Sequence, residues 1–262
     1  MVAPRLDHEA FFDLTRRLGI DSVEIRNDLP GVALQDGTPA AKVGEAAKAR
    51  GLRVLSINAL QRFNIWDEAR AKEAGELIAA SAASGAQALV LCPVNDVNYT
   101  RSPAERGEAL RKALRGLAPL LKAAGIIGLV EPLGFVECSL RTKAEAVEAI
   151  EAVGEVDRFR VVHDTFHHYV AGETKIFPKH TGLVHISGVT DPAATAATMR
   201  DPHRVLVDAN DRIDNIGQLR ALRAGGYSGP LSFEPFAASV HDSQTIEVDL
   251  AASVAYVTAG LK

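Results

Sequence analysis

Four residues of the types that bind metal ions each end, or nearly end, a short apolar segment of the chain. The four residues are Glu131, Asp164, His185 and Glu234. Three carboxylates and one imidazole suit a single divalent ion of the manganese, magnesium, cobalt or zinc kind. One such residue alone would be an ordinary polar strand end. Four of them after successive segments predict one shared metal site.

The segments that carry these residues must be parallel strands if their side chains are to meet. Each apolar run is too short for a helix and is separated from the next by a helical stretch, which is typical of buried parallel strands. The same pattern predicts seven strands, near residues 22, 54, 90, 129, 161, 184 and 232. Such strands, joined by right-handed crossovers, form either an open doubly wound sheet or a closed barrel.

Two features favour closure, and so an α/β fold of the (β/α)8 TIM-barrel type. Ligands from four neighbouring strands converge most easily at the mouth of a barrel, and no GxGxxG or Walker-type loop follows an early strand. The eighth strand can only be a short first strand at Met1–Pro4, which we expect because unpaired sheet edges are a liability. Residues 1–262 are expected to form one domain. The long irregular region at about 188–214 is expected to lie over the site as a lid.

The composition is that of an ordinary globular protein. The chain has 262 residues, of which 47% are hydrophobic and 24% charged, and its net charge of −4 argues against nucleic acid or an acidic membrane surface as a partner. Cys92 and Cys138 form no CxxC pair, no run of 18 apolar residues occurs, and the N-terminus lacks the apolar core of a signal peptide. We therefore expect a cytoplasmic protein without a membrane partner. The sequence leaves a homo-oligomer open.

The segments around the four residues carry a family resemblance that covers essentially the whole chain. They read Val130-Glu131-Pro132-Leu133-Gly134, His163-Asp164-Thr165-Phe166-His167, Val184-His185-Ile186-Ser187-Gly188-Val189 and Phe233-Glu234-Pro235. The chain resembles the xylose-isomerase-like TIM-barrel superfamily, which includes sugar isomerases and ketose 3-epimerases, inosose isomerases and dehydratases, and the endonuclease IV branch. The Glu-Asp-His-Glu metal set of that family maps onto the four residues in type and order.

The resemblance implies a metal-dependent isomerase or epimerase of a small polyol ketone, either a ketose or an inosose. Glu131 and Glu234 are then the catalytic residues, which move a carbon-bound proton through an enediolate while also touching the metal. Asp164 and His185 are plain ligands. The imidazole favours a transition metal, with Mn²⁺ as the first choice and Co²⁺, Mg²⁺ and Zn²⁺ behind it.

The resemblance also implies residues that bind the substrate. In the ketose 3-epimerases a second Glu lies six residues after the first, and a His lies three residues after the metal Asp, which here gives Glu137 and His167. Those enzymes have an Arg six residues after the metal His, but this chain has Asp191 there. Arg204 or Arg212, in the lid region, is expected to supply the missing contact.

Three other activities compete with this interpretation. The first is a lyase on the same scaffold, an inosose dehydratase or an enzyme that eliminates from a 3-keto sugar. The second is a nuclease of the endonuclease IV type, which needs further His ligands where this chain has Asn58 and Cys92. The third is a sugar-binding barrel without catalysis, against which the intact ligand set argues.

A few polar residues on the strands remain to be placed. Asn58 ends the second strand and is a candidate for a hydrogen bond in the pocket. Glu24 and Arg26 point the same way from the first strand, either as a structural ion pair or as substrate contacts. His163 alternates away from Asp164, so we expect a structural role for it.

Overall fold

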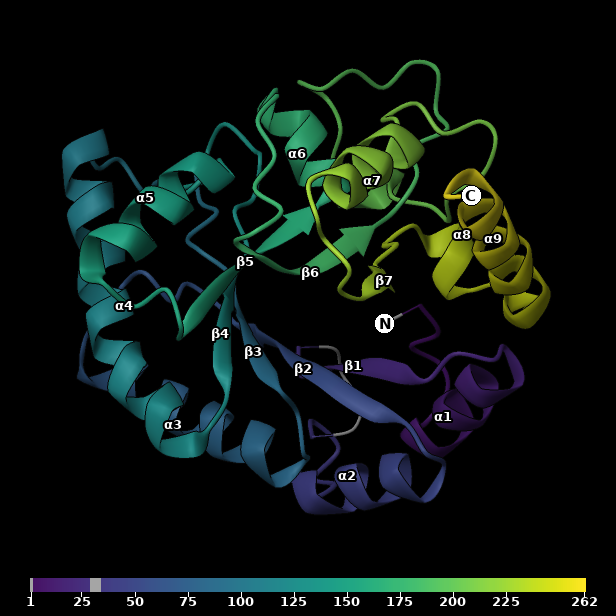
Figure 1. The fold of residues 1–262 in the computed structure, drawn as a ribbon, viewed down its shortest axis with the longest axis horizontal. Coiled ribbons are helices and arrows are strands. Elements are labelled where there is room, and N and C mark those ends of the chain that lie inside the picture. Colours follow the sequence, from purple (N-terminus) through teal and green to yellow (C-terminus); the bar gives the residue numbers. More distant parts are fainter. Residues whose placement is uncertain (1, 29–33) are drawn as a thin grey trace.

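The computed structural model describes residues 2–28 and 34–262. Seven parallel strands follow one another in sequence order within one sheet, and each is hydrogen-bonded to the next. The sheet curls around a central axis and almost closes (Figure 1). The strands are β1 Ser22–Arg26, β2 Arg53–Leu60, β3 Ala88–Leu91, β4 Ile127–Val130, β5 Phe159–Asp164, β6 Thr181–Ile186 and β7 Leu231–Phe233. The seven strands and the TIM-barrel fold predicted from the sequence are confirmed.

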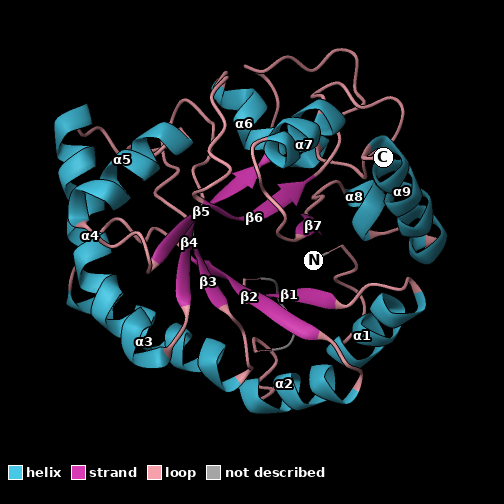
Figure 2. Cartoon of the chain, viewed as in Figure 1, coloured by secondary structure: helices cyan, strands magenta, loops and turns pink. Residues whose placement is uncertain are grey.

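Helices connect the strands and surround the sheet on its outer side (Figure 2). They are α1 His8–Arg17, α2 Ala40–Ala49, α3 Glu68–Ala83, α4 Pro103–Ala124, α5 Lys143–Val153, α6 Thr165–Ala171, α7 Asn215–Ala224, α8 Ala238–His241 and α9 Ile246–Gly260, with a 3-10 turn, η1, at Asp201–His203. Within the described ranges, no helix combines the length and the apolar character that crossing a membrane requires.

Local sequence signals set the ends of the longer helices. At the start of α4, the Ser102 hydroxyl accepts from the Glu105 backbone N–H and the Glu105 carboxylate accepts from the Ser102 backbone, with Pro103 as the first helical residue. Gly125 ends the helix with a left-handed backbone at φ 70°, which a glycine adopts without steric cost. The chain is thereby turned directly into β4.

The alternation of side chains along the strands decides which residues reach the interior of the barrel. Leu129, Val162 and Leu183 belong to one buried apolar cluster, and each lies two residues before a predicted metal ligand. Because side chains i and i+2 share a face of a strand, the ligands point to the same interior. His163 points to the opposite side, where its Nε2 lies 3.0 Å from the Gln218 Oε1 of α7.

The barrel has a seam between β1 and β7, where the N-terminus lies (Figure 1). Val2 and Ala3 are buried there, but none of the described residues Val2–Pro4 belongs to a strand. The prediction of a first strand is wrong for these residues, and Met1 lies outside the described ranges. The physical reason is local: Pro4 has no N–H to donate to a ladder, and the Ala3 carbonyl accepts from Leu6 N in a turn at 3.1 Å.

Candidate active site

The four predicted ligands meet at the carboxyl ends of neighbouring strands. Glu131 follows β4, Asp164 ends β5, His185 lies in β6 and Glu234 follows β7, and the sheet register sets Asp164 directly opposite His185. All four side chains are buried, and one potential ligand atom from each lies within 4.8 Å of the others. This is the one group of this kind found among residues 2–28 and 34–262.

The His185 ring is held between carboxylates on both of its nitrogen atoms. Nδ1 lies 2.7 Å from Glu131 Oε1 and 3.2 Å from Glu234 Oε2, whereas Nε2 lies 3.1 Å from Glu24 Oε2. A histidine that binds a metal usually donates its other N–H to a carboxylate, which fixes the tautomer and the ring. With Nδ1 facing the other ligands and Nε2 facing Glu24, the ring is oriented as a metal ligand requires. The donor set and its geometry therefore fit one divalent ion.

Arg204 reaches from the lid region into the same cluster. One of its terminal nitrogen atoms lies 2.6 Å from Asp164 Oδ2 and 2.9 Å from Glu234 Oε2, and its Nε donates to Ser187 Oγ at 2.9 Å. Its guanidinium lies 4.7 Å from the ring centre of Phe236, and its side chain is 1% exposed. The lid is thus anchored to the site by a buried cation that offsets part of the carboxylate charge.

The two glutamates that face His185 have pKa values shifted in opposite directions. Burial raises the pKa of Glu131, and the charges of Glu234 and Asp164 add to that rise. Burial would also raise the pKa of Glu234, but the charges of His185 and Arg204 hold it well below its usual value.

Two of the four residues, Glu131 and Glu234, also line a pocket of about 280 Å³. It is lined by polar and aromatic side chains that include Arg26, Asn58, Cys92, Glu131, Phe135, His167, Asp201, Arg204, Glu234 and Phe236. Its size is near the lower end of small-molecule sites, which span about 300–1,000 Å³. A small polar molecule is the kind of ligand it can enclose.

Three of the four predicted substrate-binding residues line this pocket. Asn58 donates from Nδ2 to Glu234 Oε1 at 2.9 Å, and Arg204 lies in the pocket wall. His167 is 4% exposed, and its Nδ1 is buried without a hydrogen-bond partner among the described residues. Such an atom is costly to bury unless a ligand or water satisfies it.

The fourth residue, Glu137, lies elsewhere. It is absent from the pocket lining, and its Oε1 is 3.9 Å from the Arg200 guanidinium of the lid. Arg212 also lies away from the pocket, where it donates to the backbone carbonyls of Asp191 and Ala194 and so braces the lid loop. Of the two lid arginines considered from the sequence, the structure places Arg204 at the site.

The structure also places residues that the sequence left open or did not indicate. Cys92 follows β3 at the same level at which Glu131 follows β4, and its Sγ lies 3.5 Å from Glu131 Oε2. Phe236 comes two residues after Glu234. Glu24 and Arg26 do not pair with each other: Arg26 donates to Asp28 Oδ1 at 2.7 Å, whereas Glu24 faces His185. The sequence analysis had already put Cys92 at a position where a nuclease would need a His ligand, and the register of β3 and β4 sets it beside Glu131.

We expect Arg204→Met to destabilise the metal-free protein strongly. The substitution leaves Asp164 and Glu234 buried without their shared cation, and breaking a buried ion pair commonly costs about 3–5 kcal/mol. Thermal or urea unfolding after treatment with a chelator measures the effect. The matched control is Arg200→Met, a lid arginine with a half-exposed side chain, which should cost less than about 1 kcal/mol. Equal losses in the two variants would contradict the role assigned to Arg204.

Comparison with known proteins places the chain in a family. Residues 12–256 match the model of the xylose isomerase-like TIM barrel, so the chain belongs to this family. An inosose isomerase of Halalkalibacterium halodurans is 28% identical over 235 residues, which cover 83% of this chain and 79% of that protein.

Two solved structures extend the comparison. A xylose isomerase domain containing protein from Salmonella typhimurium LT2 is 35% identical with a TM-score of 0.89, covering 98% of this chain and 94% of that one. The IolI protein, solved with a zinc atom, is 21% identical with a TM-score of 0.86, covering 98% and 93%. The second likeness shows a shared fold.

Proposed function

We propose that the protein is a metal-dependent isomerase or epimerase of a small polyol ketone, a ketose or an inosose. The observation that carries the proposal is the buried cluster of three carboxylates and one imidazole, two members of which, Glu131 and Glu234, line a pocket of about 280 Å³. The relative named inosose isomerase supports the class of reaction and of substrate.

Glu131, Asp164, His185 and Glu234 would hold one divalent ion. When bound, the ion supplies positive charge next to the carbonyl and hydroxyl oxygens of the substrate. The mixed oxygen and nitrogen donors favour a transition metal, and Mn²⁺ is our first choice. The zinc atom in the IolI structure keeps Zn²⁺ beside Co²⁺ and Mg²⁺ as alternatives.

The two glutamates would carry the proton. One of them, as a carboxylate, would remove the proton from the carbon. The other would return a proton to the enediolate. Return to the other face of the same carbon gives an epimer, and return to the neighbouring carbon gives an isomer.

Other pocket residues would orient the substrate and exclude water. His167 offers a ring nitrogen without a partner among the described residues, and Asn58 and Arg204 offer donors beside Glu234. Phe135 and Phe236 supply apolar wall. Glu137 would reach the substrate only if its loop turned toward the pocket.

An activity screen tests the proposal. Mn²⁺-loaded protein is incubated with free ketoses, inososes and 3-keto glycosides, and the products are followed by NMR and mass spectrometry, with chelated protein as the control. We expect an equilibrium mixture of isomers of unchanged mass from at least one ketose or inosose. A product lighter by one water would instead assign the lyase reaction. Metal-loaded protein that turns over none of these compounds would contradict the proposal.

A further inference from the structure

A carboxylate that belongs to none of the four ligands lies directly behind the metal-site histidine. Glu24, in the middle of β1, places its Oε2 3.1 Å from His185 Nε2, on the side of the ring away from Glu131 and Glu234. The two residues come from strands far apart in the sheet order, β1 and β6. Because the sheet almost closes, the contact bridges β7 and the seam on the inner side of the barrel.

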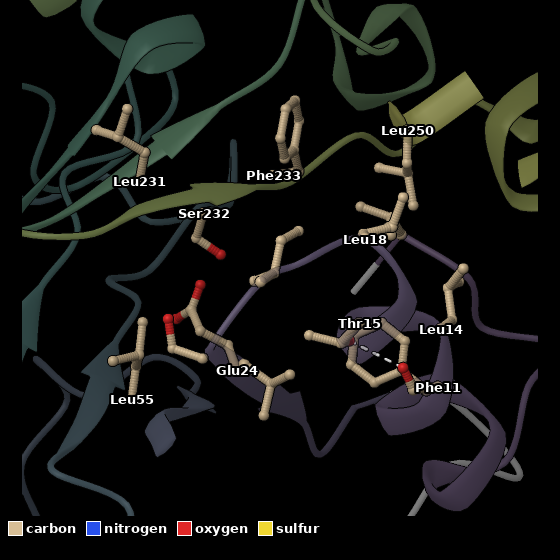
Figure 3. Close-up of a pocket in the computed structure, with 14 residues that line it drawn as sticks. Phe11, Leu14, Thr15, Leu18, Glu24, Leu55, Leu231, Ser232, Phe233 and Leu250 are labelled. Atoms are coloured by element: carbon tan, nitrogen blue, oxygen red, sulfur yellow. Dashed lines mark hydrogen bonds between the residues drawn. The ribbon is translucent and has the colours of Figure 1, made fainter. Parts of the chain in front are cut away.

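The surroundings of Glu24 hold its carboxylate in place. The Ser56 hydroxyl on β2 donates to Oε1, and the Ser232 hydroxyl on β7 lies beside the carboxylate (Figure 3). The glutamate stands at the inner end of the seam between β1 and β7, next to a largely apolar cavity lined by Leu14, Leu55 and Phe233 (Figure 3). Its side chain is 8% exposed.

No cation other than His185 pairs with this carboxylate among the described residues. Arg26, two positions along the same strand, turns instead to Asp28. Burying a carboxylate next to an apolar cavity is costly unless it is paired. A leucine or serine at position 24 would avoid the cost of burying a charge. The negative charge of Glu24 therefore acts on the imidazole of His185, which it contacts.

We propose that Glu24 is a positioning residue for the metal site: it accepts the Nε2–H of His185 and so presents Nδ1 to the ion. The ring then cannot turn over, and its Nδ1 is a stronger donor because of the negative charge behind it. The inference rests on the proposed metal site and adds a fifth residue, one that touches neither metal nor substrate.

Metal binding to three variants of the whole protein tests this. Co²⁺ is titrated into wild type, Glu24→Ala, Glu24→Gln and the control Thr15→Val, with affinity and the visible absorption spectrum recorded at one pH. Thr15 lines the same cavity, but its hydroxyl donates to the Phe11 carbonyl of its own helix. Loss of such an outer partner commonly weakens metal binding by about 10–100-fold, which we expect for Glu24→Ala together with a changed spectrum.

The conservative variant separates positioning from packing. Glutamine keeps an oxygen that can accept the Nε2–H of His185 but lacks the negative charge. Glu24→Gln should therefore bind Co²⁺ with an affinity between those of wild type and Glu24→Ala. Its visible absorption spectrum should be that of wild type. Thr15→Val should match wild type.

Wild-type affinity and spectrum in Glu24→Ala would overturn the inference while leaving the proposed function intact. If that variant does not fold, Glu24→Leu, which can neither accept the Nε2–H nor carry charge, takes its place, and wild-type affinity and spectrum in Glu24→Leu overturn the inference. Wild-type protein that binds no Co²⁺ would remove the metal site itself, and the inference with it.

Discussion

Glu234→Gln is expected to lower turnover by about 10²–10⁴-fold, the range that general acid–base steps commonly contribute. Glutamine keeps an oxygen that can touch a metal and accept from Asn58, but it cannot accept a proton from carbon. Substrate binding should therefore fall far less than turnover, so that kcat and not KM carries the change. Steady-state kinetics with the substrate found in the screen measure both constants.

Two further variants are measured beside Glu234→Gln for comparison. Glu151→Gln, on the outer surface of α5, should leave kinetics unchanged and shows that a glutamate-to-glutamine change is harmless elsewhere. His167→Ala should damage binding and rate moderately, because its proposed part is to orient a substrate hydroxyl. Near-normal turnover by Glu234→Gln would exclude a proton shuttle through the two glutamates.

His185→Ala is expected to remove most of the affinity for a divalent ion. The substitution deletes the nitrogen donor and leaves three carboxylates crowded around a vacated space, with Arg204 and Arg26 as cations close to them. Wild-type protein should retain one ion per chain after dialysis, and His185→Ala should retain much less. Metal analysis by mass spectrometry measures both. The matched control is His163→Gln, which changes the neighbouring histidine on the outer face of β5. Equal metal content in wild type and His185→Ala would show that the site is wrongly assigned.

The strands and the meeting of the four ligands could be predicted because both follow from local rules. Alternation along a strand fixes which side chains face the interior, and parallel strands end at one edge of the sheet. Asp164 and His185 therefore had to lie close together once their segments were recognised as neighbouring strands, as the register shows.

The contacts that cross the barrel could not be predicted in this way. Arg204 belongs to an irregular region, and only the folded path of that region shows that its guanidinium lies between Asp164 and Glu234. Glu24 was considered as a partner of Arg26 or of the substrate, but its partner is His185, 161 residues further along the chain. No periodicity or spacing in the sequence indicates that two such distant positions are in contact.

The wrong expectation at the N-terminus has a different origin. A first strand was expected because a barrel with open edges is a liability. In the structure Val2 and Ala3 are buried at the seam but do not pair with a strand. Their apolar side chains cover part of a sheet edge that has no hydrogen-bonded neighbour there. The hydrogen-bonded turn between Ala3 and Leu6 therefore determines the backbone at Pro4, although a strand there would have closed the barrel.

The most direct test of the proton-transfer account is turnover by the metal-loaded protein in heavy water. If Glu131 and Glu234 remove and return a carbon-bound proton, the product should carry deuterium at the reacting carbon and be otherwise unchanged in composition. NMR locates the deuterium, and mass spectrometry confirms that no water is lost. A product formed without any deuterium from the solvent would contradict the account.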